Sequence, residues 1–433
     1  MNLHGRLDFR SGRAAGTGII AGWPAVDIRP LRQRDRLWCG VPVLKVVRSI
    51  VVPEAEVVRA RLAEWSAAHP DDARVRLLDV ERGRTGRPAP GWGAAFLRSL
   101  VETAAAGCPA DRSSAPDVRE LGGLPFRLTL GSEWAQLGYS HALGDGTASW
   151  DFLGWLLAQD NWRGFGSERC TNGPLTRGLL TTFCRPKSKL PQAVSMQREI
   201  RHLRAKGVEQ AMDVAGAPSF VTTTVASSDS FVQGVRRFRA VRGSPASVMS
   251  IMTLRALLLC RHHGLKVDDT VVFMVDLRRY LAAGGTVAGN FSWSKSVPIL
   301  DSDTPTELST RIGGILDSGL PLLIFGQAMQ RSMIHGSGRP PARGSGAVRL
   351  MMSYGTRWPS APPPAGASPP QITVSIAPPG PNFLAFNVVE AYDRIHVSVN
   401  RSGGLDRTLV DRIATDFVAD LGTSPIDELL WGR

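Results

Sequence analysis

The sequence predicts an α/β (α+β) protein of two lobes, on three observations. At 433 residues the chain is longer than one ordinary core and fits two domains. Strand-like and helix-like segments alternate twice along it. Between the two sets lies a stretch rich in Arg and Lys with little apolar periodicity. We therefore expect an N-terminal lobe over residues 1–165, a crossover linker over 166–215 and a C-terminal lobe over 216–433.

The elements of the first lobe are predicted from apolar spacing. Residues up to Leu37 are rich in Arg and Gly and predict a leading loop. β-branched runs predict strands, and apolar residues at helical spacing predict helices. In order, these are a strand over Val41–Val52, a helix from Pro53 to His69, a strand over Arg74–Val80, a helix over Ala94–Ala106, paired strands over Phe126–Leu130 and Trp134–Tyr139, and a helix over Ala148–Leu157.

The second lobe repeats this mixture of strands and helices. Residues 335–371 are dense in Gly and Pro and predict a loop. The expected elements are a strand over Phe220–Val225, a helix over Ala246–His262, a strand over Thr270–Asp276, a strand after Asn290, a helix over Thr306–Met333, strands over Ile372–Ile376, Phe383–Val389 and Ile395–Val399, and a helix over Asp406–Leu421.

Composition restricts the compartment and the partners. The longest apolar run, Leu320–Phe325, is far shorter than the ~20 residues of a membrane-spanning helix, and the N-terminus lacks the pattern of a secretory signal. Five scattered Cys residues form no CxxC, so we expect a reduced, cytoplasmic protein without a thiolate metal site. A net charge of +13 favours nucleic acid, an acidic protein or a phosphorylated ligand as partner. No nucleic-acid-binding motif accompanies the charge, which argues against the first.

One short motif carries most of the functional signal. His141, Asp145 and Gly146 form an HxxxDG where a predicted strand turns into a helix. Histidine is the side chain best matched to proton abstraction near neutral pH. Asp145 would hold the turn through an ion pair, and Gly146 would allow its backbone geometry. By average residue usage, roughly one chain in thirty of this length would contain the pattern by chance. The motif therefore needs support from the rest of the chain.

That support comes from two other segments in a fixed order. A helix ending at His69-Pro70 is followed by Arg74-Val75-Arg76, and Asp276-Leu277-Arg278 is followed by Gly289-Asn290-Phe291. With HxxxDG between them, these segments resemble the condensation-domain-like acyltransferases, over about Leu37 to Leu421. The order of the three is fairly specific to that superfamily, but it does not specify a subfamily.

The resemblance implies two pseudo-symmetric lobes, each like chloramphenicol acetyltransferase, with a tunnel between them. An acyl thioester on coenzyme A or an acyl carrier protein would enter from one side, and an alcohol or amine acceptor from the other. His141 would take the proton of the acceptor, and no tightly bound cofactor or metal is implied. Gly146 would lie where the pantetheine chain passes. Natural-product biosynthesis is the expected setting.

The resemblance also suggests supporting residues around the motif. Arg74 is the candidate ion-pair partner of Asp145, with three weaker candidates. A polar group of the facing lobe should stabilise the tetrahedral oxyanion. The weaker cations are Arg76, Arg278 and Arg279, and the candidate oxyanion or tunnel residues are Asn290, Ser292, Ser294 and Ser140.

The chain departs from the superfamily pattern at one position. Ser140 stands where peptide-forming condensation domains carry a first histidine. Ester-forming branches also lack that histidine, and no adenylation or carrier segment is present in the sequence. Both points favour an ester- or amide-forming acyltransferase that works on its own. The alternative is a catalytically silent, condensation-like protein that binds carrier proteins and recruits partners.

The basic charge fits the same interpretation. Acyl carrier proteins are acidic and coenzyme A carries phosphates, so the basic crossover segment suits either donor. We expect a monomer with a small-molecule acceptor and a carrier-protein partner, and neither nucleic acid nor a membrane as partner.

Overall fold

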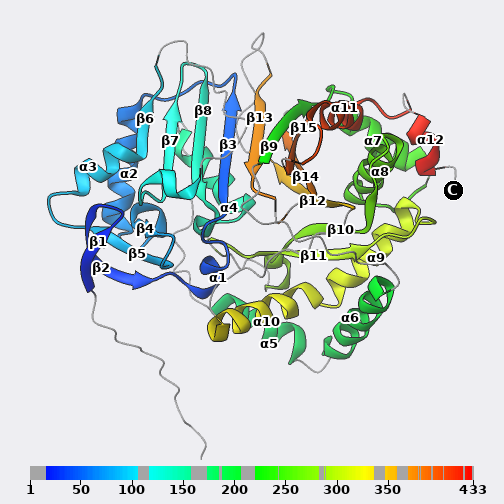
Figure 1. Ribbon diagram of the computed structural model, residues 1–433, viewed down its shortest axis with the longest axis horizontal. Coiled ribbons are helices and arrows are strands. Elements are labelled where there is room, and N and C mark those ends of the chain that lie inside the picture. Colours follow the sequence, from blue (N-terminus) through cyan, green and yellow to red (C-terminus); the bar gives the residue numbers. More distant parts are fainter. Residues whose placement is uncertain are drawn as a thin grey trace, which may run out of the picture.

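The computed structural model has two α/β halves that lie side by side (Figure 1). It describes residues 16–105, 117–157, 173–184, 188–205, 220–241, 243–281, 287, 289–335, 347–357, 369–378, 380, 382–391, 394–402, 404–422 and 425–431. Both ends of the predicted linker, 165/166 and 215/216, fall outside these ranges, so the domain boundaries stay a prediction. The α/β fold class is confirmed by three sheets flanked by helices.

Two sheets form the first half. A five-stranded sheet has the order β13-β3-β8-β7-β6, in which only the β6–β7 pair is parallel. A small antiparallel sheet has the order β1-β2-β5-β4. The strand bounds are β13 Gln371–Ile376, β3 Pro42–Arg48, β8 Trp134–Ser140, β7 Phe126–Leu130, β6 Val101–Thr103, β1 Gly16–Ile20, β2 Trp23–Pro30, β5 Arg84–Pro88 and β4 Leu77–Asp79.

A six-stranded sheet forms the second half. Its order is β11-β10-β12-β14-β15-β9, and the β10–β12 and β12–β14 pairs are parallel. Alternate residues of its strands, such as Phe273, Phe386 and Val397, pack in one apolar core with helices α7 (Phe231–Val241), α8 (Val248–His262) and α11 (Arg407–Val418). The strand bounds are β11 Ser292–Pro298, β10 Val267–Asp276, β12 Val348–Arg357, β14 Phe383–Ala391, β15 Arg394–Ser402 and β9 Phe220–Ala226.

Helices cover the sheets on their outer sides and at the base of the view in Figure 1. Thr304 begins α9 with a capping box to Glu307, and Pro305 occupies the first turn. The α-helices are α1 Gln33–Arg36, α2 Ala55–Ala68, α3 Gly93–Leu100, α4 Gly146–Leu157, α5 Gly173–Phe183, α6 Leu190–Ala205, α7 Phe231–Val241, α8 Val248–His262, α9 Pro305–Asp317, α10 Leu320–His335, α11 Arg407–Val418 and α12 Pro425–Trp431. Short 3₁₀ turns are η1 Ala73–Val75, η2 Val118–Leu121, η3 His141–Leu143 and η4 Leu277–Tyr280.

Several predicted elements differ from the structure. The expected helix over Thr306–Met333 is two helices, because Gly319 between them has a φ of +75° that a continuing helix cannot adopt. The basic segment predicted as a linker contains α5 and α6. The Gly/Pro-dense region 335–371 contains β12, and the leading loop contains β1 and β2. Among the described residues no single helix is long and apolar enough to cross a membrane. Only α9 and α10 reach that length and composition together, as a pair bent by 53°.

Strand β13 joins the two halves. It lies late in the chain, yet it pairs antiparallel with β3 and completes the five-stranded sheet of the first half. Its other side faces β15 of the second half (Figure 1). Side chains of β15 take up the β13 amides that β3 leaves free: Ser398 Oγ accepts from Val374 N at 2.8 Å, and Asn400 Oδ1 from Ile376 N at 3.1 Å. The halves are therefore connected by hydrogen bonds from the backbone of β13 to side chains of β15.

Candidate functional site

The HxxxDG segment lies where the first half meets the second. Strand β8 delivers Ser140 at its end, η3 carries His141, and α4 begins at Gly146. His141 is 5% exposed and Asp145 is 2% exposed, so both side chains are buried at this contact. The residues that face them are Val287, Gly289, Asn290 and Phe291 of the second half.

Asn290 fixes the orientation and the tautomer of His141. The amide nitrogen of Asn290 donates to the backbone oxygen of His141 at 2.7 Å and lies 3.5 Å from Asp35 Oδ1. Its Oδ1 is therefore the atom 3.0 Å from His141 Nδ1, and Nδ1 carries the proton and donates. Nε2, which has no hydrogen-bond partner among the described residues, keeps its lone pair as a base.

Burial sets the charge state of the imidazole. Desolvation lowers the pKa of His141 below its usual 6.5, and it outweighs the raising effects of Asp145 and Asn290. The neutral base therefore predominates at neutral pH. Trp38, which follows α1, stacks on the imidazole with ring centroids 4.4 Å apart and planes 19° apart. This stacking excludes water from one face of the base.

Asp145 connects the turn to the second half. Its Oδ2 accepts from Arg278 Nη1 at 2.8 Å and from Phe291 N at 2.9 Å, and its Oδ1 accepts from Ala148 N at 3.1 Å. Arg278 also donates to the carbonyls of Val287 and Gly289 at 2.8 and 3.0 Å. Gly289 has a φ of +86°, a conformation that favours glycine. The ion pair thus shapes the segment that carries Asn290.

The predicted partner of Asp145 is corrected by these contacts. Arg278, one of the weaker candidates, forms the ion pair. Arg74 instead donates through Nε to Asp72 at 2.7 Å, because Asp72 caps η1 only two residues away. Arg76 binds Asp27, and Arg279 lies 3.8 Å from Asp317 at the surface.

The other predicted site residues occupy different positions. Ser140 Oγ accepts from Ala142 N at 3.3 Å and is a local cap. Asn290 contacts His141 directly, and its amide nitrogen is engaged there, so it positions the base. Ser292 is 8% exposed, and its Oγ has no hydrogen-bond partner among the described residues. Ser294, two residues further along β11, is half-buried. Gly146 is exposed.

Lys45 is a buried lysine that the motifs did not indicate. It lies on β3, where its Nζ donates to Ser149 Oγ at 2.6 Å and to Gly146 O at 3.2 Å. Nζ also lies 3.9 Å from the centroid of Trp150. Burial lowers the pKa of Lys45 well below its usual 10.5. A lysine inside the apolar run Val43–Val47 breaks the strand pattern, and this break was the available signal.

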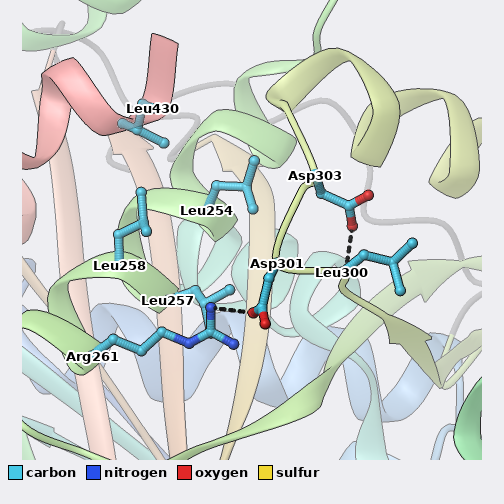
Figure 2. Close-up of a pocket in the computed structure, with 8 residues that line it drawn as sticks. All are labelled: Leu254, Leu257, Leu258, Arg261, Leu300, Asp301, Asp303 and Leu430. Atoms are coloured by element: carbon cyan, nitrogen blue, oxygen red, sulfur yellow. Dashed lines mark hydrogen bonds and ion pairs between the residues drawn. The ribbon is translucent and has the colours of Figure 1, made fainter. Parts of the chain in front are cut away.

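A pocket unrelated to this site lies on the outer side of the second half (Figure 2). Leucines of α8 and α12 line it, and Arg261 pairs with Asp301 at its edge at 2.9 Å. None of its lining residues contacts His141, so it does not belong to the site. Among the described residues, no group of three or more His, Cys, Asp and Glu side chains could hold a metal ion.

Solved structures show that this fold is a known one. The chain has the chloramphenicol-acetyltransferase-like fold of condensation domains. It is similar to trichothecene 15-O-acetyltransferase of Fusarium sporotrichioides, with 12% identity, a TM-score of 0.60, and coverage of 93% of this chain and 96% of that one. The SgcC5 protein of Streptomyces globisporus matches with 14% identity and a TM-score of 0.55, over 90% and 97%.

A third solved structure also has a similar fold. Polyketide synthase associated protein 5 of Mycobacterium tuberculosis matches with 15% identity and a TM-score of 0.53, over 90% of this chain and 97% of that one. No protein-family model matches this chain, and no curated protein matches it in sequence. At these identities the comparisons show the fold alone.

Proposed function

We propose that the protein is an acyltransferase, which moves an acyl group from a phosphopantetheine thioester to a hydroxyl or amine of a small molecule. The observation that carries this is the state of His141: Nδ1 donates to Asn290, and Nε2, at the contact between the halves, has no hydrogen-bond partner among the described residues. Structural neighbours that are named as an acetyltransferase and as condensation domains support the reaction class.

The proposed chemistry assigns one role to each group. Nε2 of His141 takes the proton of the acceptor as its oxygen or nitrogen attacks the thioester carbonyl carbon. The carbon–sulfur bond of the tetrahedral intermediate then breaks, and the imidazolium returns the proton to the leaving thiolate. The hydrogen bond to Asn290 supports the imidazolium between these steps. Asp145 and Arg278 hold the two halves together and transfer no proton.

Of the four residues predicted for the oxyanion, we favour Ser292 over Asn290, Ser294 and Ser140. The Oγ of Ser292 is buried and has no hydrogen-bond partner among the described residues. The amide nitrogen of Asn290 already donates to the backbone oxygen of His141, and the Oγ of Ser140 caps η3. A hydroxyl donor directed at the developing charge is worth about 10²–10³-fold in rate.

The test is a transfer assay with a panel of donors and acceptors. Acyl-coenzyme A thioesters and acyl-loaded carrier proteins are incubated with alcohols and amines, and products are identified by mass spectrometry. We expect an ester or amide product above the rate without protein. Carrier binding without any product would contradict the proposal and favour the silent, recruiting alternative.

A further inference from the structure

The five-stranded sheet of the first half has a lysine inside its apolar core. Lys45 is 1% exposed and lies on β3 between Val43 and Val47, which pack in that core. Side chains alternate along a strand, so the lysine points to the same face as these two valines. The residues that pair with it on the neighbouring strands are Leu137 and Val374, both buried. An amine in this position loses its hydration, which costs stability unless its hydrogen bonds compensate.

The hydrogen bonds of Lys45 are directed at the start of α4. Its Nζ donates to Ser149 Oγ at 2.6 Å and to Gly146 O at 3.2 Å, and both residues lie in the first turn of that helix. Ser149 Oγ in turn donates to the backbone oxygen of Asp145 at 2.7 Å. Two hydrogen bonds in series therefore connect β3 to the aspartate of the HxxxDG.

Asp145 is thus held from both halves of the protein. The second half binds its carboxylate through Arg278. The first half binds its backbone oxygen through Ser149, which Lys45 holds. His141 lies four residues before Asp145 on the same turn, so the contacts that fix the aspartate also fix the base. A displacement of about 1 Å in a reacting group can cost 10²-fold in rate, so this support affects the reaction.

We propose that Lys45 is a positioning residue for the acyl transfer, which fixes the first turn of α4 and thereby holds Asp145 and His141 in place from the side of the first half. Lys45 is buried and its Nζ bonds to the protein, so its role needs no contact with substrate. The role rests on the proposed function and names a further residue that serves the same site.

The charge of Lys45 has a consequence for the base itself. Burial lowers the pKa of His141 most, and the positive charge of Lys45 adds to this effect, against the raising effect of Asp145. Removal of the lysine charge should therefore raise the pKa of His141. Because the base must be neutral to accept a proton, the acid limb of kcat/KM would then move to higher pH.

Other charged or titratable groups face these two side chains from several elements. None of them is changed when Lys45 alone is replaced, so a shift of the acid limb reports the lysine. They are Tyr139 of β8, Asp145 at the turn, Asp151 of α4, Arg74 of η1, Arg278 of η4, and Arg34 and Asp35 of α1, which packs against η3.

Lys45→Met separates positioning from stability. Ser149 Oγ still donates to Asp145 O, and Gly146 O, the first carbonyl of α4, still accepts within the helix. The change also removes a desolvated amine, so the melting temperature should stay at or above that of wild type. A lysine with a structural role alone would show the opposite result, a lower melting temperature with an unchanged kcat in the folded protein.

The experiment compares Lys45→Met with Lys295→Met, using a donor and an acceptor that the wild type accepts. Lys295 is a second buried lysine, 7% exposed on β11, and its Nζ donates to Gln197 Oε1 of α6 at 3.4 Å. We expect the kcat of Lys45→Met to fall about 10-fold, as for other supporting residues, with little change in KM. The acid limb of kcat/KM should move to higher pH. Lys295→Met should keep both at their wild-type values.

Three results would overturn the positioning role. They are a wild-type kcat in a folded Lys45→Met protein, an equal fall of kcat in Lys295→Met, and an acid limb that stays in place. If Lys45→Met does not fold, Ser149→Ala removes the same hydrogen bond with a smaller change. Its kcat should then fall, and a wild-type kcat would overturn the role. A wild type that transfers no acyl group is a different outcome, because the proposed function itself then fails.

Discussion

The two halves meet at two junctions that are built differently. At the HxxxDG junction, charged and amide side chains cross between the halves, with Asp145 bound to Arg278 and His141 to Asn290. At the β13 junction, backbone amides of a strand of one sheet donate hydrogen bonds to the side chains of Ser398 and Asn400 of the other. The first junction contains a base with a free lone pair. At the second, the backbone amides of β13 are bound.

This difference indicates that the HxxxDG junction serves the reaction and that the β13 junction supports the fold. A backbone strand held along its length moves little, so the β13 junction fixes the distance between the halves. The side-chain contacts of the HxxxDG junction can then orient one imidazole without having to hold the lobes alone. Substitutions at the first junction should therefore affect turnover and stability together, and those at the second should affect stability.

The largest effect on stability is expected from Arg278→Leu. This change leaves Asp145 buried without its cation, which costs about 3–5 kcal/mol of unfolding free energy. Urea unfolding followed by circular dichroism measures it. Arg279→Leu is the control, since its ion pair with Asp317 is exposed and 3.8 Å long, and should cost less than about 1 kcal/mol. Equal losses in the two variants would show that the Asp145 pair does not hold the junction.

Asn290→Ala should reduce turnover with a smaller loss of stability. The imidazole then loses the acceptor that fixes its tautomer, and supporting residues of this kind are worth about 10–100-fold in activity. Steady-state kcat and KM report the change, which should fall mainly on kcat. If a folded Asn290→Ala protein keeps the wild-type kcat, Asn290 does not position the imidazole of His141.

Asn400→Ala tests the β13 junction. The substitution leaves the amide of Ile376 and the carbonyl of Val374 without partners, for a loss of about 1–3 kcal/mol. Thermal melting measures the loss, and the kcat of the folded fraction should change little. A large fall in kcat at unchanged stability would instead place Asn400 in the reaction.

His396, also on β15, should make the stability of the folded protein depend on pH below neutral pH. Burial, with a smaller contribution from Arg394, lowers its pKa to about 4. Because the folded-state pKa lies below 6.5, the stability from neutral His396 is fully present above pH 6.5 and is lost as pH falls toward 4. Protonation also removes the Nδ1 acceptor of Ile372 N. Melting temperatures between pH 7 and 4 should fall less steeply in His396→Gln, and parallel curves would contradict this.

The sequence predicted the motif residues of the site better than it predicted the residues that pack around them. His141, Asp145, Arg278 and Asn290 belong to ordered motifs, and the structure brings them together. The sequence did not indicate Trp38, because the contact of Trp38 with His141 depends on how two distant segments pack. Local alternation predicts that residues 372–376 form a strand, but it does not reveal that β3 is their partner. Similarly, Arg74 lies beside Asp72 because of the 3₁₀ turn η1, which the sequence pattern did not predict.

The central claim is that His141 is the general base, and its most direct test is kcat/KM for acyl transfer in His141→Ala. With the melting temperature near that of wild type, the account predicts a fall of about 10²–10⁴-fold, the usual contribution of a general base. A folded His141→Ala protein that transfers the acyl group within twofold of the wild-type rate would contradict it.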